Sequence, residues 1–174
     1  TRSFSEVIFK DVEVELLEKS KDAISPIQKS IDAGRVALAA DTLGAAQEMI
    51  YKAVEYSKER KQFGRVIGSF QAVKHMCAEM AADLEPCYAM LWQAAYSFDH
   101  DPDEARLQAC QAKSHISEVA KMVSKKATEV HGGMGFTDLL GLHYWFKRIG
   151  LNRQLLGGPE LVREEAAEIQ GFNQ

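Results

Sequence analysis

The sequence predicts an all-α fold: an up-down antiparallel four-helix bundle with an additional terminal helix, preceded by a short lone β-strand. Two observations support this prediction. From residue 25 onward, apolar residues recur every three or four positions over long stretches, which is the period of an amphipathic helix. Short segments containing Gly or Pro separate these stretches, and short connections between long helices make them antiparallel neighbours.

The first residues have a different pattern. The run VIFKDVEVE at 7–15 is rich in β-branched residues and partly alternates, which is typical of a strand. A strand needs a neighbour for its backbone hydrogen bonds, and the sequence predicts no second one. We therefore expect residues 1–22 to be the remnant of a preceding β-domain and 23–174 to form the bundle. A chain of 174 residues has room for one full domain and a fragment of another.

The first helix is predicted to begin at Ser25 and Pro26, as N-cap and first helical residue, and to run to Lys61. Its segment VALAADTLGAAQEMI is apolar nearly all round, which indicates a central helix packed on several sides. Gly34 and Gly44 each weaken a helix by about 1 kcal/mol relative to Ala. We therefore expect a neighbouring helix or a ligand to approach closely at these two positions.

The second helix follows a turn bracketed by Gly64 and Gly68. Ser69 is its predicted N-cap, and apolar residues run through 70–98 in alternating steps of three and four, as in a helix bundle. Pro86 lies within this run, and a proline inside a helix removes a backbone hydrogen bond. The sequence therefore predicts a kink or a local break at this point.

Three further helices complete the predicted bundle. One is expected from Pro102 to the glycines at 132–133, and a shorter one from Leu139 to Leu155. The last helix is predicted over 159–169, because Pro159 suits a first helical position and acidic residues follow it.

Charge and composition exclude several classes of protein. The net charge is −4 and the 21 Lys and Arg residues are scattered, so we expect no binding of nucleic acid. The longest uncharged stretch, 86–98, is too short to span a bilayer, and the first residues have no signal-peptide pattern. Cys77, Cys87 and Cys110 fit no metal-binding spacing. We expect reduced core thiols, no metal site and a cytoplasmic location.

Three clusters could carry chemistry. At the end of the first helix, Arg60 and Phe63 form either a cap that complements the helix dipole or an anion clamp with an aromatic ring beside it. The segment HGGMGFT at 131–137 either lets the backbone approach a ligand or only stops a helix, and its spacing is not a dinucleotide fingerprint. The segment LLGGPE at 155–160 is interpreted either as a loop alone, which is favoured, or as a loop that opens a helix whose amino end faces an anion. Asp41, in an apolar stretch, is expected to bond a neighbouring helix or to face solvent.

The order of these segments resembles the C-terminal helical domain of the acyl-CoA dehydrogenase family over nearly the whole chain. GRVALAADTLGAAQ and AVEYSKERKQFGRVIGSFQAVKHMCAEMA resemble the first two helices of that domain and the R-x-x-F-G turn between them. EVHGGMGFT resembles its Q-x-x-G-G-x-G loop, and VIFKDVEV resembles the end of its middle β-domain.

This resemblance implies a tetrameric FAD flavoprotein of fatty acid metabolism. Such an oxidoreductase removes the α and β hydrogens of an acyl-CoA thioester and passes electrons to an electron-transfer flavoprotein. By position, Arg35 matches an arginine near the CoA and acyl pocket. The residues matched to FAD binding are Arg60, Phe63, Gln71, Glu129, Gly132, Gly133 and Gly135. Glu129 stands where the family motif has Gln, and a carboxylate there repels phosphates unless it is protonated or turned away.

The resemblance places the family's catalytic Glu at Gly157, or in some members on the first helix, where this sequence reads Ala33-Gly34-Arg35. Neither position supplies a carboxylate, so a base would come from elsewhere, such as Asp41, Glu160, a missing domain or a partner subunit. Three functions remain open: the C-terminal FAD-binding and oligomerisation domain of a flavoenzyme, a non-catalytic subunit of a hetero-oligomeric acyl-CoA dehydrogenase, and a helical interaction module without redox activity. We expect the isolated chain to be inactive, to hold no FAD and to form dimers or tetramers.

Overall fold

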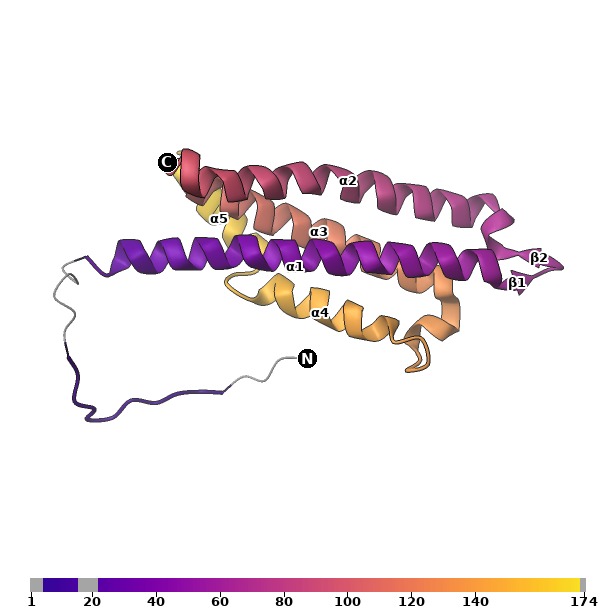
Figure 1. Ribbon diagram of the computed structural model, residues 1–174, viewed down its shortest axis with the longest axis horizontal. Helices are drawn as coiled ribbons and strands as arrows, with labels where there is room; N and C mark the ends of the chain where they lie inside the picture. The colour runs from indigo at the N-terminus through magenta and orange to yellow at the C-terminus, as the bar shows by residue number, and fades with distance from the viewer. Residues whose placement is uncertain (1–4, 16–21, 173–174) are drawn as a thin grey trace.

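The computed structural model describes residues 5–15 and 22–172. The elements in order are α1 (Ile24–Glu59), β1 (Lys61–Gln62), β2 (Arg65–Val66), η1 (Ile67–Ser69), α2 (Gln71–His100), α3 (Ala105–His131), η2 (Gly132–Phe136), α4 (Leu142–Gln154) and α5 (Pro159–Ile169). Helices α1 to α4 run alternately in opposite directions along one axis (Figure 1). The predicted all-α up-down bundle with an additional terminal helix is confirmed.

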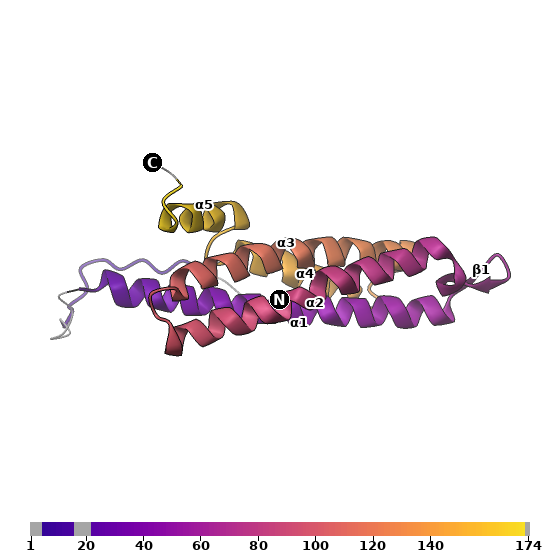
Figure 2. The same ribbon diagram turned by 90° about the horizontal axis from the view of Figure 1, so that it is seen from above.

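Helix α3 is at the centre of this arrangement. It packs against α1, α2, α4 and α5, whereas α5 contacts mainly α3. Figure 2 shows α5 outside the four-helix bundle, on the side of α3. The main core lies between α1, α2 and α3, and among its fully buried side chains are Met49, Met80, Leu84, Ile116 and Val123. A second, smaller core of Cys110, Val162 and Ala166 holds α5 in place.

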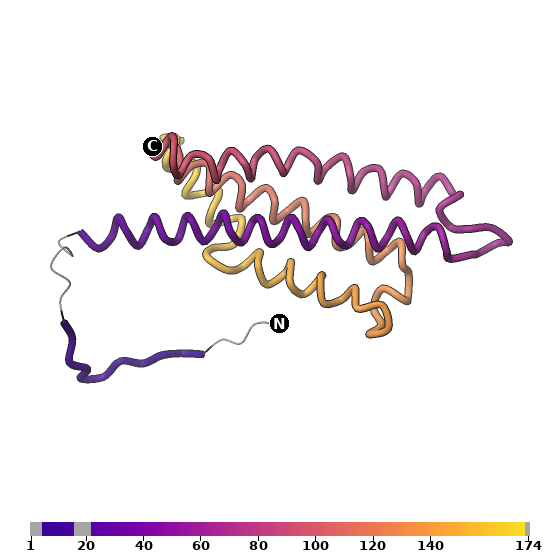
Figure 3. Tube along the Cα trace, in the orientation of Figure 1, coloured from indigo at the N-terminus to yellow at the C-terminus, as the bar shows by residue number. Residues whose placement is uncertain are grey.

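The strand predicted at 7–15 does not form. The backbone is irregular over residues 5–15, all of these side chains are exposed, and the trace in Figure 3 shows the segment outside the bundle. Strand geometry is stabilised by hydrogen bonds to a second strand, and no described residue pairs with this segment. The apolar residues Val7, Ile8 and Phe9 consequently face solvent.

Several helix ends differ from their predictions. Helix α1 begins at Ile24 without a side-chain cap, and α3 begins at Ala105, three residues after Pro102. The Ser69 hydroxyl does not cap α2 but donates to the carbonyl of Val66, 2.7 Å away. Helix α2 continues without a break through Pro86. Because Pro86 is exposed, the helix carbonyl that it leaves without a partner can bond water.

Residues 61–66 form a small hairpin that the sequence reasoning missed, and it overlaps the turn predicted between Gly64 and Gly68. In it, Lys61 pairs with Val66 and Gln62 with Arg65. The two residues between the strands are Phe63, with φ 52°, and Gly64, with φ 77°. Two successive positive φ angles are typical of the tight type I′ hairpin turn. The hairpin extends the end of the bundle beyond α1 and α2 (Figure 1).

Candidate functional site

A groove of about 400 Å³ lies at the hairpin end of the bundle. Tyr56, Arg60 and Gln62 line one side of it, and residues 129–134 at the end of α3 and in η2 line the other. The structure therefore brings together four of the seven residues matched to FAD binding, which are Arg60, Glu129, Gly132 and Gly133. These residues are about seventy positions apart in the sequence, and the antiparallel pairing of α1 and α3 places them side by side.

Three cations lie in and next to the hairpin. Arg60, Lys61 and Arg65 are all exposed. Among the described residues, no carboxylate forms an ion pair with any of the three. The Arg65 guanidinium lies 4.0 Å from the centre of the Phe70 ring. Cations that are not neutralised within the protein suit an anionic ligand such as a phosphate. Glu129 is exposed on the other side of the same groove.

The three glycines of the 131–137 segment differ in backbone conformation and in burial. Gly132 has φ 57°, a conformation that L side chains rarely adopt. Gly133 has open space around the position of a side chain, so its backbone is accessible from the groove. Gly135 is buried, and a Cβ there would lie 2.9 Å from the carbonyl oxygen of Thr128. Gly135 therefore packs the loop against α3 and does not line the groove.

The buried His131 and the half-buried Tyr56 also line the groove, and sequence reasoning did not select either of them as a site residue. Their rings stack with centroids 4.5 Å apart. The His131 Nδ1–H donates to the carbonyl of Ala127 at 2.7 Å, and burial lowers the pKa of His131, which favours the neutral imidazole. His131 is the first residue of the glycine-rich segment 131–137. This position next to the glycines was the signal in the sequence that could have identified it.

Phe63 and Gln71 lie at the same end of the bundle but outside the groove. Phe63 is at the tip of the hairpin, 92% exposed, with its ring edge-on to Phe70 at a centroid distance of 6.1 Å. Gln71 is the first residue of α2 and is also exposed. Neither side chain packs into this bundle, so both can contact a ligand or another part of an assembly.

Arg35 lies far from this groove, in the interior of the bundle, and is only 3% exposed. Its Nη1 and Nη2 donate to the two carboxylate oxygens of Glu165, each at 2.7 Å. Its Nε donates to the carbonyl of Leu156 at 2.9 Å, and its Nη1 also contacts Asp32 at 3.2 Å. Arg35 lowers the pKa of Glu165, whereas burial raises the pKa of Asp32. The guanidinium is thus fully engaged within the protein.

The loop between α4 and α5 lies against the first helix. Leu156 and Gly157 have φ angles of 56° and 102°. A Cβ on Gly34 would lie 2.5 Å from Cδ1 of Leu156, so the close neighbour of Gly34 is a loop side chain and not the neighbouring helix or ligand that was predicted. The close approach predicted at Gly44 is wrong, because Gly44 is exposed and a Cβ there would meet open space. Residues 33–35 and 155–158, which only the resemblance matched to the family's base, are therefore neighbours in this fold.

The two carboxylates considered as substitute bases are both bound to arginines. Asp41 accepts hydrogen bonds from Arg148 and Asn152, which join α1 to α4. Glu160 accepts from Arg153 at 2.7 Å, and the pKa of Glu160 is lowered first by a hydrogen bond from its own backbone and then by the one from Arg153. A carboxylate held ionised by an arginine is a weaker proton acceptor.

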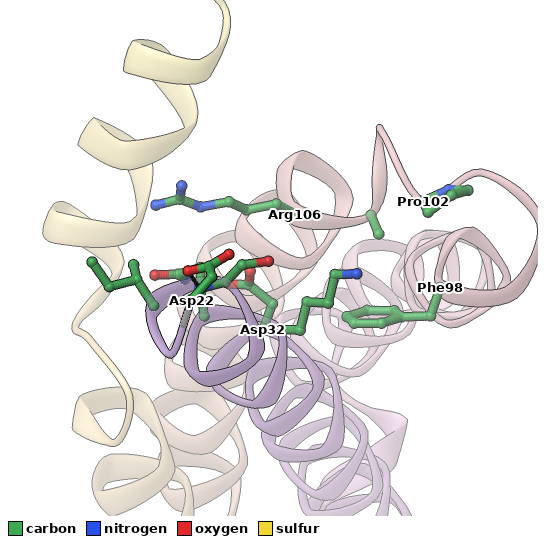
Figure 4. Close-up of a pocket in the computed structure, with 10 residues that line it drawn as sticks. Asp22, Asp32, Phe98, Pro102 and Arg106 are labelled. Atoms are coloured by element: carbon green, nitrogen blue, oxygen red, sulfur yellow. Dashed lines mark hydrogen bonds between the residues drawn. The ribbon is translucent and has the colours of Figure 1, made fainter. Parts of the chain in front are cut away.

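A separate cavity of about 570 Å³ lies at the opposite end of the bundle, where α1 begins and α2 ends (Figure 4). Asp22, Asp32, Phe98, Pro102 and Arg106 contribute to its lining. None of the residues matched to FAD binding lines it. Among the described residues, no group of His, Cys, Asp or Glu side chains is arranged to hold a metal ion. No helix in the described ranges is long and apolar enough to cross a membrane.

Comparison with known proteins identifies a family for this fold. A family profile described as "Acyl-CoA dehydrogenase, C-terminal domain" matches residues 24–170. The "Caffeyl-CoA reductase-Etf complex subunit CarC" of Acetobacterium woodii is 36% identical over 135 residues, which cover 76% of this chain and 35% of that protein.

Two solved structures are similar in fold. The glutaryl-coenzyme A dehydrogenase glutaryl-CoA complex has a TM-score of 0.84 and 25% identity, covering 91% of this chain and 40% of that one. The ChsE4-ChsE5 complex from Mycobacterium tuberculosis has a TM-score of 0.76 and 26% identity, covering 83% of this chain and 39% of that one. The chain thus spans less than half of the length of each of these three relatives.

Proposed function

The chain belongs to the acyl-CoA dehydrogenase family, and we propose that it is the FAD-binding and oligomerisation domain at the C-terminal end of such a flavoprotein. The observation that carries the proposal is the groove between the hairpin and the glycine loop. It combines Arg60, a cation without an ion pair among the described residues, with the accessible backbone of Gly133. Both features suit a phosphate-containing ligand.

The side chains and glycines at the hairpin end of the bundle have the chemical groups that would bind the parts of FAD. Arg60 would bind the pyrophosphate, with Gln71 and the exposed ring of Phe63 toward the adenosine. Gly132 and Gly133 would offer backbone contacts, and Gly135 would hold their loop on α3. Arg60 and Glu129 both line this groove, and the exposed cations Lys61 and Arg65 lie on the adjoining hairpin. When bound, FAD supplies the acceptor for a hydride from the β-carbon of an acyl-CoA thioester.

The proposed substrate, electron acceptor and domain boundary are taken from the resemblance to the family. An acyl-CoA thioester is the proposed substrate of the whole protein, with Arg35 near its binding site, and an electron-transfer flavoprotein is the proposed acceptor. Residues 1–22 are assigned to the end of a preceding β-domain. Three free cysteines suit a reducing compartment such as the cytoplasm. The isolated chain would hold no FAD and perform no dehydrogenation, because the other domains of the family complete the flavin site.

A specific observation favours a second candidate, a non-catalytic subunit of a hetero-oligomeric acyl-CoA dehydrogenase. Neither residues 33–35 nor residues 155–158 include a carboxylate, and both Asp41 and Glu160 bind arginines. Loss of a general base typically slows a reaction by about 10²–10⁴-fold. One similar structure is a complex of two proteins, ChsE4 and ChsE5, so a partner that supplies the base is a reasonable arrangement here too.

The experiment that tests the FAD assignment measures the flavin-to-protein ratio of the full-length gene product by absorbance. We expect bound flavin in the wild type and a roughly 10-fold weaker affinity after Arg60→Ala, because a charge-assisted contact is lost. Arg163→Ala, an exposed arginine on α5 at the other end of the bundle, is the matched control. Unchanged affinity in Arg60→Ala contradicts the clamp. Absence of flavin from the wild type supports a helical interaction module.

Acyl-CoA-driven bleaching of the bound flavin then separates the two remaining candidates. Bleaching by the protein alone identifies a catalytically complete enzyme. Bleaching that requires co-expression with a paralogue identifies the non-catalytic subunit.

A further inference from the structure

His131 is the last residue of α3, and its ring is held in place by neighbouring parts of the fold. The ring stacks on that of Tyr56 in α1, with the two centroids 4.5 Å apart. A Cβ on Gly135 would lie 3.1 Å from the Cβ of His131, so η2 packs directly against this residue. His131 is only 5% exposed, yet it contributes to the lining of the groove between the hairpin and the glycine segment. A ligand in the groove therefore meets an imidazole of fixed orientation.

The hydrogen bonds of His131 leave one ring nitrogen for a ligand. Nδ1 lies 2.7 Å from the carbonyl oxygen of Ala127, which can only accept, so the hydrogen-bond geometry assigns the proton to Nδ1. Burial lowers the pKa of His131, which favours the neutral ring with a lone pair on Nε2. No described residue bonds Nε2, and this atom is not among the enclosed polar atoms that lack a partner. Nε2 is therefore an acceptor that is reached from the groove.

The groove offers other acceptors as well as the cation Arg60. Helices α1 and α3 both end beside it, at Glu59 and His131 (Figure 1). The last turn of a helix presents carbonyl oxygens and a partial negative charge. Glu129 adds a carboxylate that forms no ion pair with a described residue. A ligand that suits the whole groove therefore carries hydrogen-bond donors as well as a phosphate.

We propose that Nε2 of His131 accepts a hydrogen bond from a hydroxyl or amino group in the adenosine part of the nucleotide bound in this groove. The inference rests on the proposed function, because it takes the ligand of the groove to be FAD. The adenosine of FAD carries ribose hydroxyls and an amino group next to the pyrophosphate. A ligand that fills the groove removes water from Nε2, and an acceptor buried without a donor weakens binding. The donor group therefore belongs at His131.

A phosphate is a poor partner for the same nitrogen. Its oxygens are acceptors, and a neutral imidazole whose proton lies on Nδ1 has no donor to offer them from Nε2. The guanidinium of Arg60 lines the groove and suits the phosphate instead. The two residues thus divide the ligand between them. Substitution of His131 should consequently change recognition of the adenosine, whereas substitution of Arg60 should change recognition of the pyrophosphate.

The first arm of the test measures FAD affinity of the flavin-free, full-length gene product by fluorescence titration at pH 8. His131→Phe keeps a ring to stack on Tyr56 but has no acceptor, and His131→Gln keeps an acceptor near the place of Nε2. We expect about 10-fold weaker binding after His131→Phe and binding within about 3-fold of the wild type after His131→Gln. His115→Phe is the matched control, because His115 is an exposed histidine of the same helix outside the groove.

The Tm of each flavin-free protein is measured alongside, since a purely structural role lowers Tm and affinity in both His131 variants. Wild-type affinity in His131→Phe, or equal losses in His131→Phe and His131→Gln, overturns the proposal. Absence of FAD binding by the wild type contradicts the proposed function itself. Binding that is equal in the wild type and in His131→Phe contradicts only the role of His131.

The second arm identifies the donor group with three analogues of FAD, in which 2′-deoxyadenosine, 3′-deoxyadenosine or inosine replaces adenosine. The first two each lack one ribose hydroxyl, and inosine has a carbonyl in place of the amino group. We expect one analogue to bind the wild type about 10-fold more weakly than FAD does, and to bind His131→Phe as well as FAD does. If every analogue loses the same affinity in both proteins, no adenosine group bonds His131 and the proposal is wrong.

Discussion

Arg35 on α1 and Glu165 on α5 form a bidentate salt bridge, with Nη1–Oε2 and Nη2–Oε1 distances of 2.7 Å. The two residues are 130 positions apart, and α5 packs mainly on α3. This ion pair therefore connects the terminal helix to the first helix across the bundle. Since Arg35 also binds the carbonyl of Leu156, the same guanidinium fixes the loop that precedes α5.

Glu165→Gln should lower the free energy of unfolding by about 2 kcal/mol, because it leaves the buried Arg35 charge without its main partner. Urea unfolding of the full-length protein measures this change. Glu164→Gln is the control, since Glu164 is exposed and makes no ion pair with a described residue, and we expect a change below about 0.5 kcal/mol. Equal effects of the two substitutions contradict a special role for the pair.

The same pair predicts a pH dependence. Arg35 holds the pKa of Glu165 below its usual range, so the folded state binds the proton of Glu165 less readily than the unfolded state does. The stabilisation is complete above the usual pKa of a glutamate and is lost as the pH falls through the lowered pKa. The stability of Glu165→Gln should therefore fall less steeply in acid than that of the wild type. Parallel acid-unfolding curves of the two proteins would argue against this assignment.

Gly135→Ala and Gly133→Ala should differ sharply in stability although they lie two residues apart. A Cβ on Gly135 would lie 2.9 Å from the Thr128 carbonyl oxygen and 3.1 Å from the Cβ of His131, which are backbone or near-backbone atoms that cannot move freely. We expect a loss of about 1–3 kcal/mol. Gly133 has open space around it, and its substitution should cost less than about 0.5 kcal/mol. Thermal unfolding of both variants checks this, and a matched loss contradicts the packing described.

The sequence predicted the helices well because their apolar periodicity depends on local spacing. It did not identify α3 as the helix that contacts the four others, since α3 buries small polar residues. Ser117, Ser124 and Thr128 are buried, and their hydroxyls donate to backbone carbonyls three or four residues earlier. Because these hydroxyl groups form their hydrogen bonds within their own helix, they can be buried without another partner. A search for apolar residues does not count them, so it underestimates how much of α3 is buried.

The site was predictable in part. Arg60 and the glycines at 132–133 stood out by residue type and motif, and antiparallel packing of α1 on α3 places them in one groove. The direction of a loop side chain depends on φ, which sequence spacing does not fix. The contact of Leu156 with the first helix at Gly34 therefore appears only in the fold.

Lys113 on α3 provides the last test, because it is a cation only 1% exposed and has no carboxylate partner among the described residues. Its ammonium group donates to the carbonyls of Asn152 at 2.7 Å and Arg153 at 3.1 Å, where α4 ends. Burial, followed by repulsion from Arg35 and Arg153, lowers the pKa of Lys113 to about 8. The lysine thus caps α4 at an electrostatic cost.

The unfolded chain consequently binds the Lys113 proton more tightly than the folded protein does above about pH 8, so this group makes stability rise with pH there. We expect a contribution of about 1 kcal/mol between pH 7 and 9. The thiols of Cys87 and Cys110, whose pKa values burial raises to about 11, act in the opposite direction and remain in both proteins compared. Urea unfolding of the wild type and of Lys113→Met at both pH values isolates the lysine. The wild type should gain about 1 kcal/mol more than the variant, and equal pH dependences would show that Lys113 does not titrate in this range.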